Sequence, residues 1–134
     1  MKSEVLLANA LTARSAAYAP YSKFAVGAAL ETKTGRVFVG CNVENLSFGL
    51  TICAERNAIF SAVAAGERGF SRIVIVADST EPITPCGACR QVLAEFSEDM
   101  EVWCVNLQGR EFRARLGELL PRAKAGILGT LSST

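Results

Sequence analysis

Hydrophobic positions recur along the chain with two spacings, one typical of helices and one typical of strands. The helical spacing predicts helices over residues 3–18, 52–65 and 86–96, and a short helix that ends near Pro121. Apolar runs bounded by turn residues predict strands over residues 24–32, 36–42, 72–77, 102–105 and 111–115. In the first helix we expect Leu7, Leu11 and Tyr18 to share the buried face. The tail, from about residue 122, gives no clear prediction.

The order of these elements predicts the fold class. Residues 73–76 form a continuous apolar run, which is typical of a strand covered on both faces. Helices that alternate with buried strands indicate an α/β protein with a single mixed five-stranded sheet and helices on both faces. A chain of 134 residues suits one domain, which we expect to span residues 1–134. The loops that lead to Cys53 and Cys86 should then lie at the same end of the sheet.

Charge and composition exclude several classes of protein. Lys and Arg total 14 and Asp and Glu total 13, so the net charge of +1 lacks the basic excess of nucleic-acid-binding domains. No apolar run resembles a signal peptide or reaches the roughly 20 residues of a membrane helix. The five cysteines are odd in number and unevenly spaced, which favours a reducing compartment over a disulfide framework. We therefore expect a cytoplasmic protein that binds neither nucleic acid nor membranes.

The sequence contains no histidine, and this restricts the chemistry of any active site. Ser-His-Asp triads, Cys-His pairs and zinc sites with a histidine ligand are all excluded. Proton transfer near neutral pH must then use a carboxylate of altered pKa, a lysine, a tyrosine or a cysteine.

Three cysteines stand where two predicted helices begin. Cys53 opens the second helix, and Cys86 and Cys89 form a Cys-x-x-Cys pair at the start of the third. Helix N-termini lower thiol pKa values and favour the thiolate that binds metal. Three protein ligands with an open position are typical of catalytic zinc, so we predict one Zn²⁺ per chain. The alternatives are a redox pair or buried cysteines, and we interpret Cys41 and Cys104 as core residues.

Two charged residues follow Cys53. Glu55 lies on a helical stripe with Ile52 and Ile59, and burial there would raise its carboxyl pKa, as a proton shuttle near pH 7 needs. Arg56 would withdraw charge from three thiolates, which leave one Zn²⁺ with a net charge of −1. The alternatives are a partly exposed glutamate that suits the helix dipole, and an ordinary surface arginine.

Longer motifs surround these residues. Cys-Ala-Glu-Arg at 53–56, followed by Pro-Cys-Gly-Ala-Cys-Arg-Gln at 85–91, resembles the small homotetrameric zinc-dependent cytidine deaminases. The same family is resembled by Tyr-Ala-Pro-Tyr-Ser-Lys-Phe at 18–24, Gly-Ala-Ala at 27–29, Gly-Cys-Asn-Val-Glu-Asn at 40–45 and Leu-Leu-Pro at 119–121. The resemblance covers nearly the whole chain to Pro121.

The resemblance implies an activity and a site. The chain would deaminate free cytidine and deoxycytidine in pyrimidine salvage, with zinc to activate water and Glu55 to move the protons. The implied substrate contacts are Phe24 on the pyrimidine, Asn42 and Glu44 on the ribose 3′-hydroxyl, the Ala54 N–H on the base O2, and the Thr84 carbonyl on the amino group. Without the resemblance, Phe24 is most often a core residue, and Asn42 and Glu44 are ordinary loop residues.

The resemblance also implies a homotetramer with active sites at subunit boundaries. The loop 45–50 carries Leu46, Phe48 and Leu50, and we expect it to wall the nucleoside pocket against a neighbour, with Phe48 among the substrate-binding residues. The chain departs from the family where Phe48 replaces a tyrosine and Lys124 replaces an aromatic residue. We therefore expect the loop to matter more than the tail.

Two other functions stay open at the level of the sequence. A polynucleotide cytosine deaminase would apply the same zinc chemistry to a flipped base, which the near-neutral charge and the short chain oppose. A non-catalytic, zinc-stabilised binding module is opposed by the three thiols and by the carboxylate on an apolar stripe. Deamination of other small cytosine-like compounds, including nucleoside antibiotics, is a minor alternative.

Overall fold

A five-stranded mixed sheet with the strand order β2-β1-β3-β4-β5 forms the centre of the structure. The computed structural model describes residues 2–128. The strands are β1 (Val26–Thr32), β2 (Val37–Cys41), β3 (Phe70–Ala77), β4 (Glu101–Asn106) and β5 (Glu111–Arg115). The helices are α1 (Lys2–Arg14), the 3-10 helix η1 (Phe48–Leu50), α2 (Ala54–Ala64), α3 (Gly87–Phe96), α4 (Leu116–Leu119) and α5 (Ala125–Leu128). The predicted α/β fold is confirmed.

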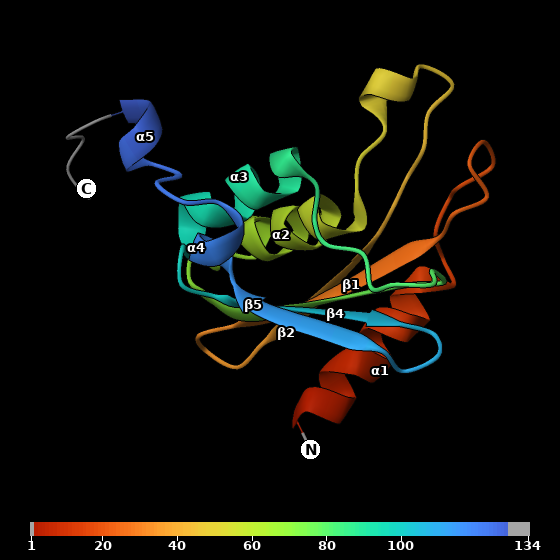
Figure 1. Cartoon of the computed structure of the whole chain (residues 1–134), viewed down its shortest axis with the longest axis horizontal. Coiled ribbons are helices and arrows are strands. Elements are labelled where there is room, and N and C mark those ends of the chain that lie inside the picture. Colours follow the sequence, from red (N-terminus) through yellow and green to blue (C-terminus); the bar gives the residue numbers. More distant parts are fainter. Residues whose placement is uncertain (1, 129–134) are drawn as a thin grey trace.

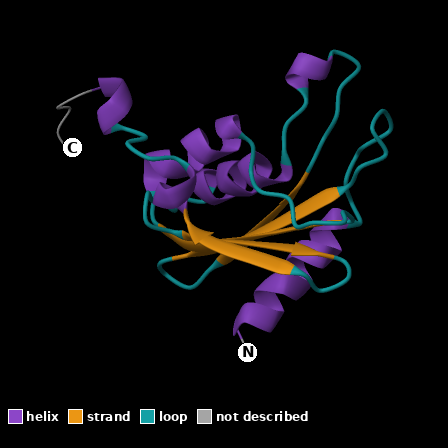
Figure 2. Cartoon of the chain, in the orientation of Figure 1, coloured by secondary structure: helices purple, strands orange, loops and turns teal. Residues whose placement is uncertain are grey.

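Helices lie on both faces of this sheet, with α1 on one side and α2 and α3 on the other (Figures 1 and 2). β3 and β4 are parallel, whereas β1 is antiparallel to both β2 and β3, and β5 is antiparallel to β4. β2, β3 and β4 therefore point the same way, and their carboxyl ends share one end of the sheet. The chain leaves β2 and β3 at this end and continues into α2 and α3, the helices that follow the candidate thiols.

Two apolar layers hold the helices to the sheet. Side chains alternate along β3, so that Ile73 and Ile75 face α2 and α3 while Val74 and Val76 face α1. The continuous apolar run of this strand is thus buried on both faces, as its sequence predicts. Within the described residues, no helix is long and apolar enough to cross a membrane.

The buried face of α1 differs from the prediction. Leu11 and Tyr18 are 42% and 54% exposed, Leu7 is only half-buried, and the helix ends before Tyr18. Ala10 instead lies fully buried against the sheet. The reason is a close approach of the backbones, because a Cβ atom at Gly27 of β1 would lie 2.1 Å from the Ala10 carbonyl oxygen. Small residues are required at this contact, and their hydrophobic signal is weaker than that of leucine.

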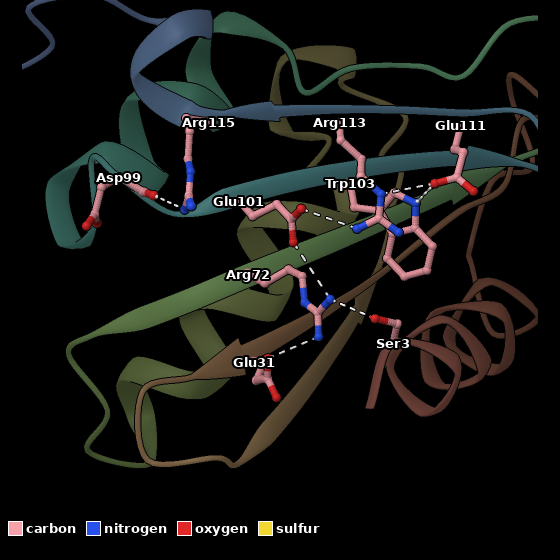
Figure 3. A network of polar contacts seen from close by, with 9 residues as sticks. All are labelled: Ser3, Glu31, Arg72, Asp99, Glu101, Trp103, Glu111, Arg113 and Arg115. Atoms are coloured by element: carbon pink, nitrogen blue, oxygen red, sulfur yellow. Dashed lines mark hydrogen bonds and ion pairs between the residues drawn. The ribbon is translucent and has the colours of Figure 1, made fainter. Parts of the chain in front are cut away.

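Charged side chains gather on β3, β4 and β5 (Figure 3). Arg72 of β3 pairs with Glu31 of β1 at 3.4 Å and with Glu101 of β4 at 3.7 Å. The Arg113 guanidinium of β5 lies 4.2 Å from the centroid of the Trp103 ring. Charges on an edge strand such as β5 disfavour pairing with another chain.

Candidate active site

Cys53, Cys86 and Cys89 meet at the carboxyl-terminal end of the parallel strands. Cys53 is the N-cap residue of α2 and Cys86 is that of α3, so both thiols lie at the positive end of a helix. The three sulfur atoms lie within 4.8 Å of one another, and Sγ of Cys86 is 3.5 Å from Sγ of Cys89. Tetrahedral Zn²⁺ with Zn–S bonds of about 2.3 Å keeps its sulfurs roughly 3.8 Å apart. The geometry and the soft thiol donors therefore fit one zinc ion.

The ligand set stops at three residues. Across residues 2–128, this cluster is the one group of three or more His, Cys, Asp or Glu side chains close enough to hold a metal. Cys104 is fully buried, as predicted, but Cys41 is only half-buried on the edge strand β2, so its assignment to the core was wrong. Three ligands leave one position of a tetrahedral ion for water or substrate, which is the pattern of catalytic zinc.

Arg56 lies against the thiols. Its Nη2 donates to Sγ of Cys53 over 3.5 Å. A hydrogen bond with Cys89 lowers the pKa of the Cys53 thiol to about 5, and the Arg56 guanidinium adds to this effect. The same hydrogen bond, together with burial, raises the pKa of Cys89. The cluster therefore favours thiolate at Cys53, and the guanidinium stabilises that negative charge.

Glu55 is buried in the first turn of α2, with 4% of its surface exposed. Burial raises the pKa of its carboxyl group to about 7; negative charge on Cys53 adds to the shift, and Arg56 opposes it. The prediction of a buried carboxyl group with a raised pKa is confirmed. A group with this pKa can both accept and donate a proton near neutral pH.

A cavity of about 290 Å³ opens in front of the thiols. Most of the predicted site residues line it: Phe24, Asn42, Glu44, Cys53, Ala54, Glu55, Thr84 and Cys86. It is also lined by four residues that the sequence analysis missed: Ser22, Val26, Thr51 and Ile83. Ser22 belongs to a motif already noted, so its position beside Phe24 was a usable signal, whereas Val26, Thr51 and Ile83 carry no chemical signal of their own.

Asn42 holds the segment that carries Phe24. Its Oδ1 accepts a hydrogen bond from the Val26 N–H at 2.9 Å, and its Nδ2 donates to the Phe24 carbonyl oxygen at 2.8 Å. Phe24 lies outside β1 and is 36% exposed, so the prediction that the strand begins there was wrong. Asn42 therefore holds the backbone at both Phe24 and Val26, and Phe24 lines the cavity.

Glu44 holds the same segment from its other end. Its Oε1 accepts from the Tyr21 and Ser22 backbone N–H groups at 3.0 and 3.1 Å, and its Oε2 accepts from the Ser22 hydroxyl. These hydrogen bonds, with that of the Ser22 hydroxyl the largest, lower the pKa of the Glu44 carboxyl group. The cavity therefore has a permanently ionised carboxylate on its rim at neutral pH.

Phe48 is the predicted substrate-binding residue that does not line this cavity. It lies in η1 with 72% of its surface exposed, and its ring meets the Tyr21 ring edge-on at 5.8 Å between centroids. Leu46 and Leu50 of the same loop are 79% and 64% exposed. The loop projects on the side of the sheet that carries α2 and α3, as the yellow segment of Figure 1 shows.

Comparisons with known proteins agree with this geometry. The family model of the cytidine and deoxycytidylate deaminase zinc-binding region matches residues 1–105. The chain belongs to this deaminase family. It is 50% identical over 124 residues to a cytidine deaminase of Halalkalibacterium halodurans, an alignment that spans 92% of this chain and 94% of that relative.

Solved structures of the family superpose closely on this chain. The crystal structure of cytidine deaminase from Burkholderia pseudomallei gives a TM-score of 0.87 at 52% identity and covers 90% of this chain and 98% of that one. A more distant relative is a blasticidin-S deaminase of Bacillus cereus, which is 33% identical over 108 residues and spans 75% of this chain and 76% of the relative. Membership of a zinc-binding deaminase family and the three-thiol cluster together fit one zinc ion per chain.

Proposed function

We propose that this protein is a zinc-dependent cytidine deaminase, which hydrolyses free cytidine and deoxycytidine to uridine and deoxyuridine with release of ammonia. The observation that carries the proposal is the buried Glu55 carboxyl group, which lines a small, mostly apolar cavity together with two residues of the three-thiol cluster. The activity would serve pyrimidine salvage. Relatives about half identical over nearly their whole length bear the name cytidine deaminase, which supports the same reading.

Cys53, Cys86 and Cys89 would hold the metal. Zinc in such a site supplies Lewis-acid activation of a water molecule. Arg56 has a supporting role, because three thiolates outweigh the charge of Zn²⁺ and would weaken that activation. Its guanidinium, 3.5 Å from the Cys53 sulfur, withdraws part of the excess negative charge.

Glu55 would carry the protons. It accepts one from the attacking water and passes it to N3 of the pyrimidine while the water oxygen forms a bond to C4. It then takes the second proton of that oxygen and gives it to the 4-amino group, which leaves as ammonia as the C4 carbonyl forms. One carboxyl group with a pKa of about 7 can serve in every transfer, so a chain without histidine can complete the reaction.

The cavity supports the predicted substrate contacts. Phe24 offers a ring to the pyrimidine, and Asn42 and Glu44 offer polar atoms to the ribose. Ala54 is the first residue of α2, where backbone N–H groups have no partner within the helix and can bind the base O2. The Thr84 carbonyl would accept from the amino group.

One assay separates this function from its rivals. Loss of ultraviolet absorbance at the cytidine band should be fast with cytidine and deoxycytidine, and slow with cytidine 5′-monophosphate and single-stranded DNA. Blasticidin S is the second candidate substrate, because one relative bears that name. Turnover of blasticidin S but not of cytidine would replace the proposed substrate, and a lack of turnover with all five compounds would favour a zinc-stabilised binding module.

We further propose a cytoplasmic homotetramer with sites at subunit boundaries. The exposed loop of Leu46, Phe48 and Leu50 supports this, because exposed apolar patches usually mark contacts. Val39 of β2 and Phe60 of α2 are 43% and 49% exposed and line a shallow apolar depression. The free thiols suit a reducing compartment. Native mass spectrometry at micromolar concentration should give the mass of four chains, and a fully active monomer would refute the shared site.

A further inference from the structure

Arg90 of α3 makes three hydrogen bonds next to the thiol cluster. Its Nε donates to the Pro85 carbonyl oxygen at 2.7 Å, and its Nη2 donates to the Thr84 hydroxyl at 3.0 Å. Its Nη1 donates to the Leu119 carbonyl oxygen at 2.9 Å. The guanidinium therefore ties the loop 84–86 to the carboxyl end of α4.

The proposed chemistry gives no role to Arg90 or to the Leu-Leu-Pro motif that it contacts. Arg90 and Gln91 follow Cys89 directly, and Leu119 begins the Leu-Leu-Pro motif near the end of the chain. Gln91 makes a parallel contact, because its Nε2 donates to the Ala123 carbonyl oxygen at 3.4 Å. Two successive side chains of α3 thus bind backbone carbonyl groups of residues 119–123.

We infer that Arg90 is a positioning residue, which fixes the loop 84–86 so that the Cys86 thiol and the Thr84 carbonyl keep their places beside the metal and the substrate. This inference rests on the proposed deaminase function. The Pro85 carbonyl that Arg90 holds belongs to the peptide bond between Pro85 and Cys86, so this contact restrains the backbone of a metal-ligand residue.

The geometry of the arginine side chain suits the role of holding several backbone and hydroxyl acceptors at once. Arginine presents five N–H donors in a rigid planar fork, so a single side chain can hold three acceptors at fixed angles, which a lysine ammonium on a flexible stem cannot do. Within residues 2–128 no carboxylate forms an ion pair with Arg90. The three hydrogen bonds of its guanidinium go to the loop 84–86 and to α4. The carboxyl end of α4 thereby becomes part of the support of the site.

The test compares zinc retention and kinetics in Arg90→Met and in the wild-type holoenzyme. Methionine keeps the apolar stem and removes every donor. Partners that orient metal ligands typically contribute 10- to 100-fold to metal affinity or activity. We expect zinc release to a chromogenic chelator to be at least about tenfold faster, and kcat/KM for cytidine to fall by a similar factor. Arg115→Met is the matched control, because Arg115 also donates to a backbone carbonyl, that of Asp99 at 2.9 Å, before the amino end of β4 (Figure 3). It should leave both quantities unchanged.

A double-mutant cycle distinguishes positioning from a general loss of structure. Thr84→Val removes one acceptor and should speed zinc release less than Arg90→Met does. In the Arg90→Met background it should add nothing, because the two side chains act through one contact. Arg90→Lys should recover only part of the loss. If Arg90→Met does not fold, faster release by Thr84→Val and Arg90→Lys than by Arg115→Met carries the inference.

Failure of the inference and failure of the proposed function give different results. A wild-type enzyme that deaminates cytidine, with Arg90→Met at wild-type zinc release and within about twofold in kcat/KM, would overturn the positioning role. Additive effects of the two substitutions on zinc release would overturn it as well. A wild-type protein that holds zinc but leaves cytidine untouched would overturn the deaminase function, while the release rates would still decide whether Arg90 fixes the loop.

Discussion

Replacement of Glu55 by glutamine should separate the catalytic role of this residue from its effect on stability. The substitution keeps the shape and removes the charge and the proton. Each proton transfer by a positioned group contributes about 10²- to 10⁴-fold, and Glu55 is proposed to act in several, so kcat/KM for cytidine should fall by at least about 10²-fold. Zinc content should stay at one per chain, because the carboxyl group is outside the thiol cluster.

The same substitution should stabilise the folded protein at neutral pH. Burial raises the pKa of Glu55 from 4.5 to about 7, so the folded state favours the protonated form. Below pH 4.5 the group is protonated in both states and has no effect. As the pH rises from 4.5 to about 7, the free energy of unfolding of the wild type falls by up to roughly 3 kcal/mol. The Glu55→Gln variant does not show this loss, because its side chain does not ionise. Three thiolates with one Zn²⁺ have a net charge of −1, so the zinc-bound cluster would not reverse the direction of the pKa shift of Glu55.

The measurement is chemical unfolding of the zinc-loaded proteins at pH 5 and pH 8, together with the cytidine assay. The stability gain of Glu55→Gln should be larger at pH 8. Glu95→Gln, on the exposed side of α3, controls for the loss of one charge and should stay within about 0.5 kcal/mol of wild type with full activity. Activity of Glu55→Gln within about tenfold of wild type, or a stability difference that does not grow with pH, would refute the reasoning.

Three further predictions test the metal centre, the packing of α2 and the rim of the cavity. Chelation of zinc should expose the Cys53 and Cys86 thiols to alkylation in the native protein, while Cys104, which is buried and whose pKa burial raises to about 12, stays unlabelled; equal labelling by mass spectrometry would count against this. Gly40→Ala would set a Cβ atom 2.4 Å from Ala54 O and Ala58 N, so unfolding should show a loss of roughly 1–3 kcal/mol, whereas Gly117→Ala, 3.5 Å from its nearest atom, should be neutral. Glu44→Ala should raise KM for cytidine more than it lowers kcat, and comparable turnover of cytidine and its 3′-phosphate by the wild type would contradict the ribose contact.

The features that the sequence predicted are those with local causes. The sequence placed Cys53 and Cys86 where two helices begin, and in the structure both are the N-cap residues of those helices. The run of residues 73–76 predicts a strand buried on both faces, and β3 is such a strand. β2 and β3 run in the same direction, so the helices that follow them, α2 and α3, begin at the same end of the sheet. The metal cluster could therefore be assembled from the sequence before any coordinates.

The features that the sequence did not predict depend on contacts between distant segments. The face of α1 was wrong because the approach of Ala10 to Gly27 is a property of two backbones and leaves no periodic signal. The role of Arg90 needs the Leu119 carbonyl, 29 positions away. The prediction that Cys41 belongs to the core is wrong because the strand pattern around it does not reveal that β2 is an edge strand. In each case the chemistry of the residue was known and its neighbour was not.

The hydrogen bonds of Asn42 and Glu44 explain why the cavity suits a sugar hydroxyl better than a phosphate. Asn42 uses its Oδ1 and one N–H to hold the segment of Phe24, so one N–H of Nδ2 is left. Glu44 accepts three hydrogen bonds of the roughly four that two carboxylate oxygens take, so one acceptor site is left. A hydroxyl group can donate to Glu44 and accept from Asn42 at once. A phosphate offers only acceptors and would bring negative charge against a carboxylate that its own hydrogen bonds keep ionised. We therefore predict a preference for nucleosides over 3′-phosphates, because one donor and one acceptor remain after the loop of residues 21–26 is held in place.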